Sequence, residues 1–154
     1  MAHILEGLVL INGADIWKEF GAFLAEEKRG GKENLTAILT PSKAKGHVAV
    51  DFREVNGEKY PTRLIVANEA RDVQLNFALF AESRQEWLTK YKRFISFLKT
   101  GQNGWLSVNF TELGLTLRLF YQDSTIFKPL TYIWKEGYHA GSFKVKFREP
   151  EPII

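Results

Sequence analysis

Apolar and polar residues alternate most regularly in the stretch RDVQLNFALF, residues 71–80. Apolar residues occupy every second position and polar or charged residues stand between most of them; the apolar set is Val73, Leu75, Phe77 and Leu79. Residues 141–149 repeat the pattern, with one face formed by Phe143, Val145 and Phe147 and the other by Lys144, Lys146 and Arg148. A period of two residues is typical of a half-buried strand, so both stretches are predicted to be β-strands.

Shorter extended stretches surround these two. Strands are predicted at 7–11, 22–24, 47–52, 104–110 and 115–122, with another piece within 125–134. Pro129 cannot donate a backbone hydrogen bond, so its strand is expected at a sheet edge or a bulge. Residues 58–70 follow neither a helical nor a strand pattern and stay ambiguous.

One stretch has a helical period. From 83 to 101, apolar residues recur every three or four positions: Trp87, Leu88, Tyr91, Phe94, Ile95 and Leu98. Ser83 and Glu86 are spaced as a capping box, and Gly101 suits the C-terminal end. The pattern predicts a helix from about 84 to 99 that packs its apolar stripe on a sheet.

Turn residues divide the rest of the chain. Asn12-Gly13 supplies the positive φ of a tight turn, and Asn56-Gly57 marks another. Asp15 is placed to cap one short helical turn that Gly21 ends. Residues 26–34, EEKRGGKEN, have no apolar side chain and are predicted to form a mobile loop.

These elements predict a mainly β (α+β) fold in one domain over residues 1–154. We expect a β-sandwich or barrel of about eight or more short antiparallel strands with one docked α-helix, at about 84–99. The composition is 45% hydrophobic and 25% charged, which agrees with a globular protein rather than a disordered one.

Charge and cysteine content exclude several function classes. The chain has no cysteine, which removes disulfides and thiolate metal sites. The net charge is only +3 and both signs are interspersed, so no specific nucleic-acid binding is expected, and the basic residues around 90–94 are interpreted as a solvated helix face. No apolar run is long enough to cross a membrane, and GLVLI is too short for a signal peptide. We therefore expect a protein made in a cytoplasm and kept there unless it leaves as part of a particle.

Candidate chemistry is sparse. His3, His47 and His139 are far apart in the sequence and are expected to be solvent-exposed or to lie on edge strands. Asp51 with Glu54, or Asp72 with Asp123, could meet across a sheet, but nothing favours either pair. No nucleophile elbow or phosphate-binding loop is present. No catalytic, cofactor-binding or metal residue is therefore assigned, and we expect a protein that is not an enzyme.

The order of motifs at the N-terminus points to a family. A leading strand ends in Ile11-Asn12-Gly13, and Asp15, Ile16, Phe20 and Gly21 follow. Later come RDVQLNFAL, then WLTKYKRFISFLKTG and GLTLRLFYQDS, in that order. This arrangement resembles the ring-forming N-terminal domain of the distal tail proteins of long-tailed phages, the hub between tail tube and baseplate, and it spans most of the chain.

The resemblance implies a tail-tube-like β-sandwich with one helix that forms a six-membered ring, a hexamer, around the tail channel. It further implies that the partners are the protein itself and other tail or baseplate proteins, in a virion tail made in the host cytoplasm. Many members carry a second domain, sometimes carbohydrate-binding; this chain ends at Ile154, so the ring-forming module is expected without a receptor-binding role. A tail-tube subunit is a close variant of this hypothesis, and a small-ligand-binding β-barrel is the alternative from another class.

Overall fold

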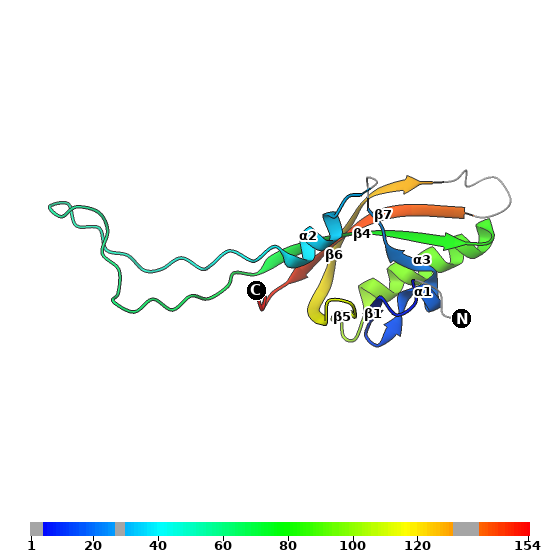
Figure 1. Cartoon of the computed structure of the whole chain (residues 1–154), viewed down its shortest axis with the longest axis horizontal. Coiled ribbons are helices and arrows are strands. Elements are labelled where there is room, and N and C mark those ends of the chain that lie inside the picture. Colours follow the sequence, from blue (N-terminus) through cyan, green and yellow to red (C-terminus); the bar gives the residue numbers. More distant parts are fainter. Residues whose placement is uncertain (1–4, 27–29, 131–138) are drawn as a thin grey trace.

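The computed structural model describes residues 5–26, 30–130 and 139–154. Within these ranges it has seven strands and three helices (Figure 1). In chain order they are β1 (Val9–Ile11), β2 (Ala14–Asp15), α1 (Ile16–Phe20), β3 (Ala22–Leu24), α2 (Glu33–Leu39), β4 (Arg71–Ala81), α3 (Arg84–Thr100), β5 (Leu106–Phe110), β6 (Leu115–Pro129) and β7 (His139–Glu149).

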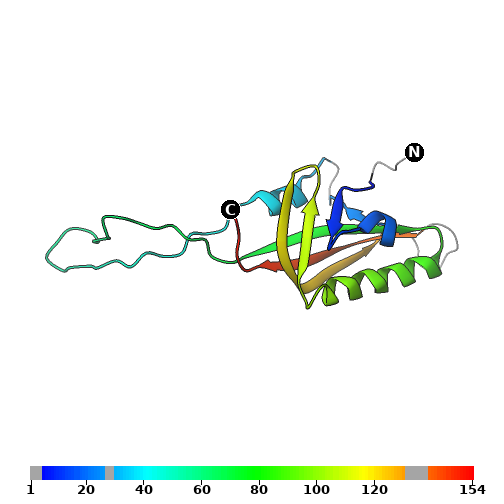
Figure 2. The ribbon, with the colours of Figure 1, turned by 90° about the horizontal axis from the view of Figure 1, so that it is seen from below.

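The strands form one antiparallel sheet that curls into a half-barrel (Figure 2). Their order is β2-β1-β5-β6-β7-β4-β3. The long strand β6 pairs with β5 over its first part, from Leu115 to Leu119, and with β7 from Phe120 to Pro129. Two register shifts interrupt the second ladder, and such bulges let a strand bend from one sheet into another. The predicted mainly β fold with one docked helix is confirmed.

Strand β6 is one continuous strand where the sequence pattern predicts two. The stretches 115–122 and 125–134 were predicted as different strands, but one continuous strand runs to Pro129. The polar residues around Asp123 interrupt the alternation because the register shifts there, between Tyr121 and Asp123. Pro129 is the last residue of the strand, as its missing donor requires, and residues 131–134 lie outside the described residues.

The N-terminal turn has the predicted chemistry. Asn12 and Gly13 both have positive φ, 51° and 83°, which is the geometry of a two-residue hairpin turn. The Asp15 carboxylate accepts hydrogen bonds from the backbone N–H groups of Trp17 (3.1 Å) and Gly7 (2.8 Å). Asp15 therefore caps α1 and also holds the residues before β1.

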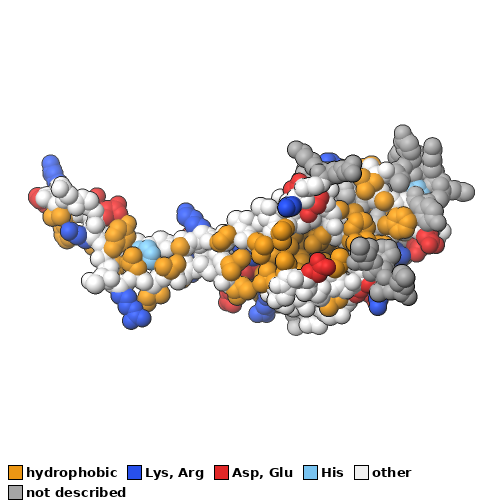
Figure 3. Space-filling view, viewed as in Figure 1, with side chains coloured by type: hydrophobic (Ala, Val, Ile, Leu, Met, Phe, Trp, Pro, Cys, Tyr) orange, Lys and Arg blue, Asp and Glu red, His pale blue; other side chains and the backbone are white. Residues whose placement is uncertain are grey.

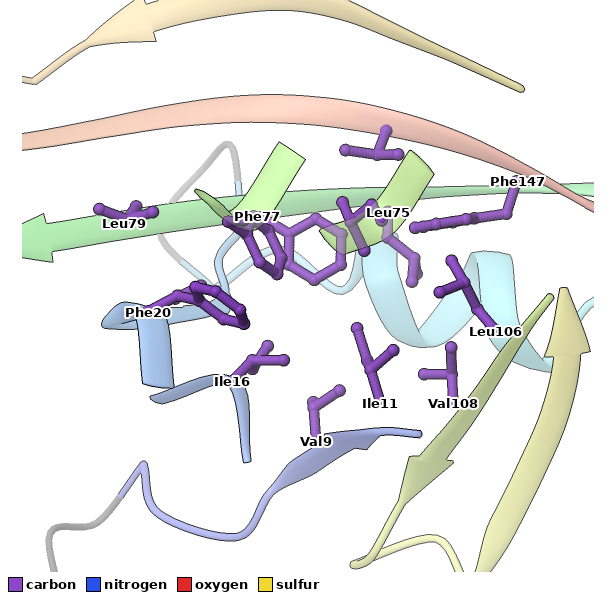
Figure 4. Packing of buried hydrophobic residues seen from close by; sticks show 14 of the residues in the cluster. Val9, Ile11, Ile16, Phe20, Leu75, Phe77, Leu79, Leu106, Val108 and Phe147 are labelled. Atoms are coloured by element: carbon purple, nitrogen blue, oxygen red, sulfur yellow. The ribbon is translucent and has the colours of Figure 1, made fainter. Parts of the chain in front are cut away.

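The core lies inside the half-barrel, beneath α3. Figure 4 shows side chains from β1, β4 and β5 converging there. Phe77, Phe94, Phe143 and Phe147 are among the largest fully buried side chains, and Phe77 makes ring contacts with the other three. Aromatic rings in this arrangement fill the space between sheet and helix.

Helix α3 agrees closely with its prediction. Trp87, Phe94 and Leu98 are buried, whereas Leu88, at the border of the stripe, is 40% exposed. The Ser83 hydroxyl accepts the N–H of Glu86, which is the expected half of the capping box. The Glu86 carboxylate instead forms an ion pair with Lys90 at 2.9 Å, one helical turn away.

The predicted mobile loop at 26–34 is wrong over its last part. Glu33 and Asn34 begin α2, and the Glu26 carboxylate accepts the N–H of Glu33 at 2.8 Å. Asn34 is buried: its side chain donates to Ala25 O and accepts from the N–H of Asn76. These polar contacts, rather than apolar side chains, hold the segment on β4; residues 27–29 lie outside the described residues.

We expect Trp87→Ala to lower the free energy of unfolding by about 3 to 5 kcal/mol, since it opens a cavity in the core. Trp87 is 2% exposed, stacks on Tyr91 and donates its indole N–H to Leu79 O at 2.8 Å. Denaturant titration measures the loss. The neighbouring change Leu88→Ala should cost less than about 1 kcal/mol; equal losses would mean that the stripe is not the buried face.

We expect Gly21→Ala to be far more destabilising than Gly114→Ala. Both glycines have a similar positive φ, 66° and 62°. An alanine at either position is therefore destabilised by about 1 kcal/mol, because its Cβ disfavours the left-handed conformation. A Cβ at Gly21 would lie 2.4 Å from Phe80 O, whereas a Cβ at Gly114 meets nothing within 4 Å. Thermal unfolding of both variants gives the comparison, and equal shifts in Tm would refute the steric contribution.

Candidate functional site

A long arm projects from the body between α2 and β4 (Figures 1 and 2). We define the arm as residues 41–70. Its two legs are linked by few backbone contacts: an isolated bridge joins Val50 to Lys59, and Lys45 N–H donates to Ala67 O. The predicted strand at 47–52 is therefore wrong except for the Val50 bridge, because no sheet lies beside it. The predicted turn at Asn56-Gly57 lies near the tip, and Gly57 has a positive φ of 71°. A separate turn precedes it, closed by the hydrogen bond from Val55 N–H to Phe52 O.

The arm exposes an unusual amount of apolar surface (Figure 3). Val48 is 81% exposed, Ile65 75% and Val66 68%. Its other exposed large hydrophobic residues are Val50, Phe52, Val55, Tyr60 and Leu64. Tyr60 donates its hydroxyl to Glu58 at 2.6 Å, and this hydrogen bond raises the tyrosine pKa. Large exposed apolar patches are typical of interaction sites.

The root of the arm is fixed by a buried ion pair. Arg71 and Glu149 are almost fully buried and their charged groups lie 3.2 Å apart. Arg71 also donates to Thr40 O, at the other side of the root. The C-terminal segment adds two contacts, since Ser42 donates to Ile154 O and Asn68 donates to Pro152 O. The root is therefore held by several polar contacts, whereas the arm beyond it has few contacts.

An apolar groove opens on the body where the curled sheet fails to close. It has a volume of about 230 Å³ and lies between β1 and β3, with α2 on one side. Its apolar lining includes Leu8, Val9, Phe23, Leu24, Leu35, Ile38, Phe110 and Leu113. Two carboxylates, Glu26 and Glu112, contribute to the lining, and burial raises the pKa of Glu26. The groove is smaller than most small-molecule sites, which occupy roughly 300–1,000 Å³.

Strand β3, which borders the groove, has an open edge. Phe80 N–H donates to Gly21 O, and Ala25 N–H donates to Asn76 O. Only alternate residues of an antiparallel strand direct their backbone groups to one neighbour. Ala22 and Leu24 therefore direct theirs away from β4, and β3 is the last strand in the sheet order.

The basic face of β7 is partly neutralised. Asp72 on β4 forms ion pairs with Arg148 at 2.9 Å and Lys146 at 3.4 Å. The hydrogen bond from Arg148, helped by Lys146, lowers the Asp72 pKa below its ordinary value. Asp72 thus pairs with cations rather than with Asp123, which stands opposite Lys146 in the register.

The remaining candidates are dispersed. His47 and the carboxylates of Asp51 and Glu54 are exposed on the arm. His139 is 1% exposed at the start of β7, so the expectation of a solvent-exposed or edge-strand histidine is wrong for it: β7 is flanked by β6 and β4. His3 lies outside the described residues. Within the described ranges, no three His, Asp or Glu side chains gather as metal ligands, and no helix is long and apolar enough to span a membrane.

Comparison with known proteins gives a likeness of fold. No protein-family model matches the chain, and no curated protein does. Among solved structures, it is similar to SPP1 Dit (gp 19.1), described as a paradigm of hub adsorption apparatus in Gram-positive infecting phages, with a TM-score of 0.58 and 13% sequence identity. The match covers 94% of this chain and 50% of that one, so the chain spans about half the length of the hub protein. The body thus has a fold found in a phage tail hub.

We expect Arg71→Met to lower the free energy of unfolding by about 3 to 5 kcal/mol, because it leaves the Glu149 charge buried without its partner. Arg148→Met is the matched control. It removes a partly exposed ion pair with Asp72 and should cost less than about 1 kcal/mol. Chemical denaturation of both variants measures the difference; similar losses would show that the root pair contributes no more than a surface pair.

Proposed function

We propose that this protein is a structural component of a phage or prophage tail, whose copies form a ring at the junction of tube and baseplate. The observation that carries the proposal is the arm, which holds large apolar side chains out in solvent and whose root is fixed by a buried ion pair. The fold found in a phage tail hub supports the same assignment. The resemblance in the sequence motifs supplies the ring size, six.

The arm favours assembly for an energetic reason. Burying apolar surface is worth roughly 25 cal/mol per Å², so three side chains such as Val48, Ile65 and Val66 offer several kcal/mol to any surface that covers them. The arm points away from its own body, which therefore does not cover them (Figure 1). In a ring of identical subunits, every arm meets the same surface of the next subunit, and the contacts close on themselves.

Other features of the body agree with a structural role. Its core is filled by aromatic side chains, and Asp72 on β4 forms ion pairs with Lys146 and Arg148 on β7. We propose that it is not an enzyme and that its other partners are tail or baseplate proteins of the virion. A ligand-binding barrel is the weaker alternative, because the groove is small and open on the surface.

The proposal predicts that the purified full chain forms a closed oligomer, observed by native mass spectrometry at increasing concentration. Replacing residues 46–66 by Asn-Gly keeps the root contact between Lys45 and Ala67 and closes it with a two-residue turn. We expect this shortened chain to be monomeric, with an unchanged circular dichroism spectrum per body residue.

Two outcomes would contradict the proposal. A full chain that stays monomeric up to millimolar concentration would oppose ring formation by the protein itself. A shortened chain that forms the same oligomer as the full chain would show that the arm does not hold the assembly together.

A further inference from the structure

We propose that the apolar groove is the receptor for the arm, and that residues 63–66 of one copy's arm lie in the groove of a second copy as a strand beside β3. The inference rests on the proposed self-assembly and specifies which two surfaces meet. It follows from three properties of the arm segment and the groove that match in chemistry, in backbone geometry and in charge.

The first match is apolar. Leu64, Ile65 and Val66 form an uninterrupted run with exposed fractions of 48%, 75% and 68%. In the arm, no other three large apolar residues follow one another directly. The groove offers an apolar lining from five elements, including Phe23 on β3 and Leu35 on α2, and Leu35 is itself 40% exposed. A β-branched pair such as Ile65-Val66 favours an extended backbone, which is the shape that a narrow groove accepts.

The second match is in backbone hydrogen bonding. Ala22 and Leu24 direct their N–H and C=O groups toward the free edge of β3, and an edge of this kind binds an added strand. Residues 63–66 lie on a leg of the arm that the isolated bridges leave largely unpaired, since these bridges engage only residues 44, 50, 59 and 68. Both strands therefore have donors and acceptors to exchange.

The third match is in charge and reach. Arg63 immediately precedes the apolar run, and Glu112 stands at the border of the groove. When the apolar run 64–66 lies in the groove, the Arg63 guanidinium comes near the Glu112 carboxylate. Ile65 is six positions before Arg71 at the root, which corresponds to about 20 Å of extended chain. The arm can thus reach a neighbouring body without any movement of its root.

A second copy is the occupant that fits. The arm runs outward from the body (Figures 1 and 2). The groove lies on the body, between β1 and β3. A contact within one chain would require the arm to fold back on itself. Donation of each arm to the next groove instead makes a head-to-tail contact, which is the type that closes into a ring.

Cysteine cross-linking tests the contact directly, because the chain has no native cysteine. The double variant Ile65→Cys/Leu113→Cys places one thiol on the arm and one at the groove, both at exposed positions. Under mild oxidation we expect a ladder of covalent multimers, up to the size of the ring, on a denaturing gel without reductant. The control Gly57→Cys/Leu113→Cys moves the arm thiol to the tip and should give no such ladder.

The outcomes separate this inference from the proposed function. A ladder with Ile65→Cys and none with Gly57→Cys supports docking of residues 63–66 in the groove. A ring by native mass spectrometry without the Ile65→Cys ladder overturns the inference and leaves ring formation intact. Absence of any oligomer contradicts both. A cross-link found only within single chains would show that the arm folds back onto its own groove.

Discussion

The double pairing of β6 is the constraint on which the rest of the structure depends. One end of this strand is hydrogen-bonded to β5 and the other to β7, so the sheet must bend where the partner changes. The bend brings the two halves of the sheet face to face over a shared aromatic core, and α3 covers the core. It also brings the first and last strands of the order, β2 and β3, close together with only α1 and Gly21 between them in sequence.

The same bend leaves the half-barrel open. A closed barrel has no strand edges, whereas this sheet ends at β3 with backbone groups that no described strand satisfies. Gly21 makes the tight passage from α1 to β3 possible because a side chain there would collide with Phe80. The groove is thus a consequence of the fold's topology rather than of a local insertion, and it lies beside the open edge of β3.

The sequence predicted the structure best where a single local property, such as burial or a positive φ, determines the choice of residue. The alternation at 71–80 and the stripe from Trp87 to Leu98 report burial directly, and Asn12-Gly13 reports a positive φ that other residues avoid. It was least informative for the arm, because the alternation at 47–52 is the same whether a strand has a sheet beside it or not. It also missed α2, which is held on β4 by the buried amides of Asn34 and Asn76 and buries only one large apolar side chain, Ile38. Which surfaces border the groove depends on contacts between β1, β3 and α2, and such non-local contacts leave no periodic signal in the sequence.

The contact between the C-terminal segment and the arm root has a practical consequence for work with this protein. Ser42 and Asn68 both donate to carbonyl groups within residues 152–154, so the last residues run alongside the place where the two legs of the arm meet. Any affinity tag or fluorescent protein fused after Ile154 would begin at that place and would crowd the first residues of the arm.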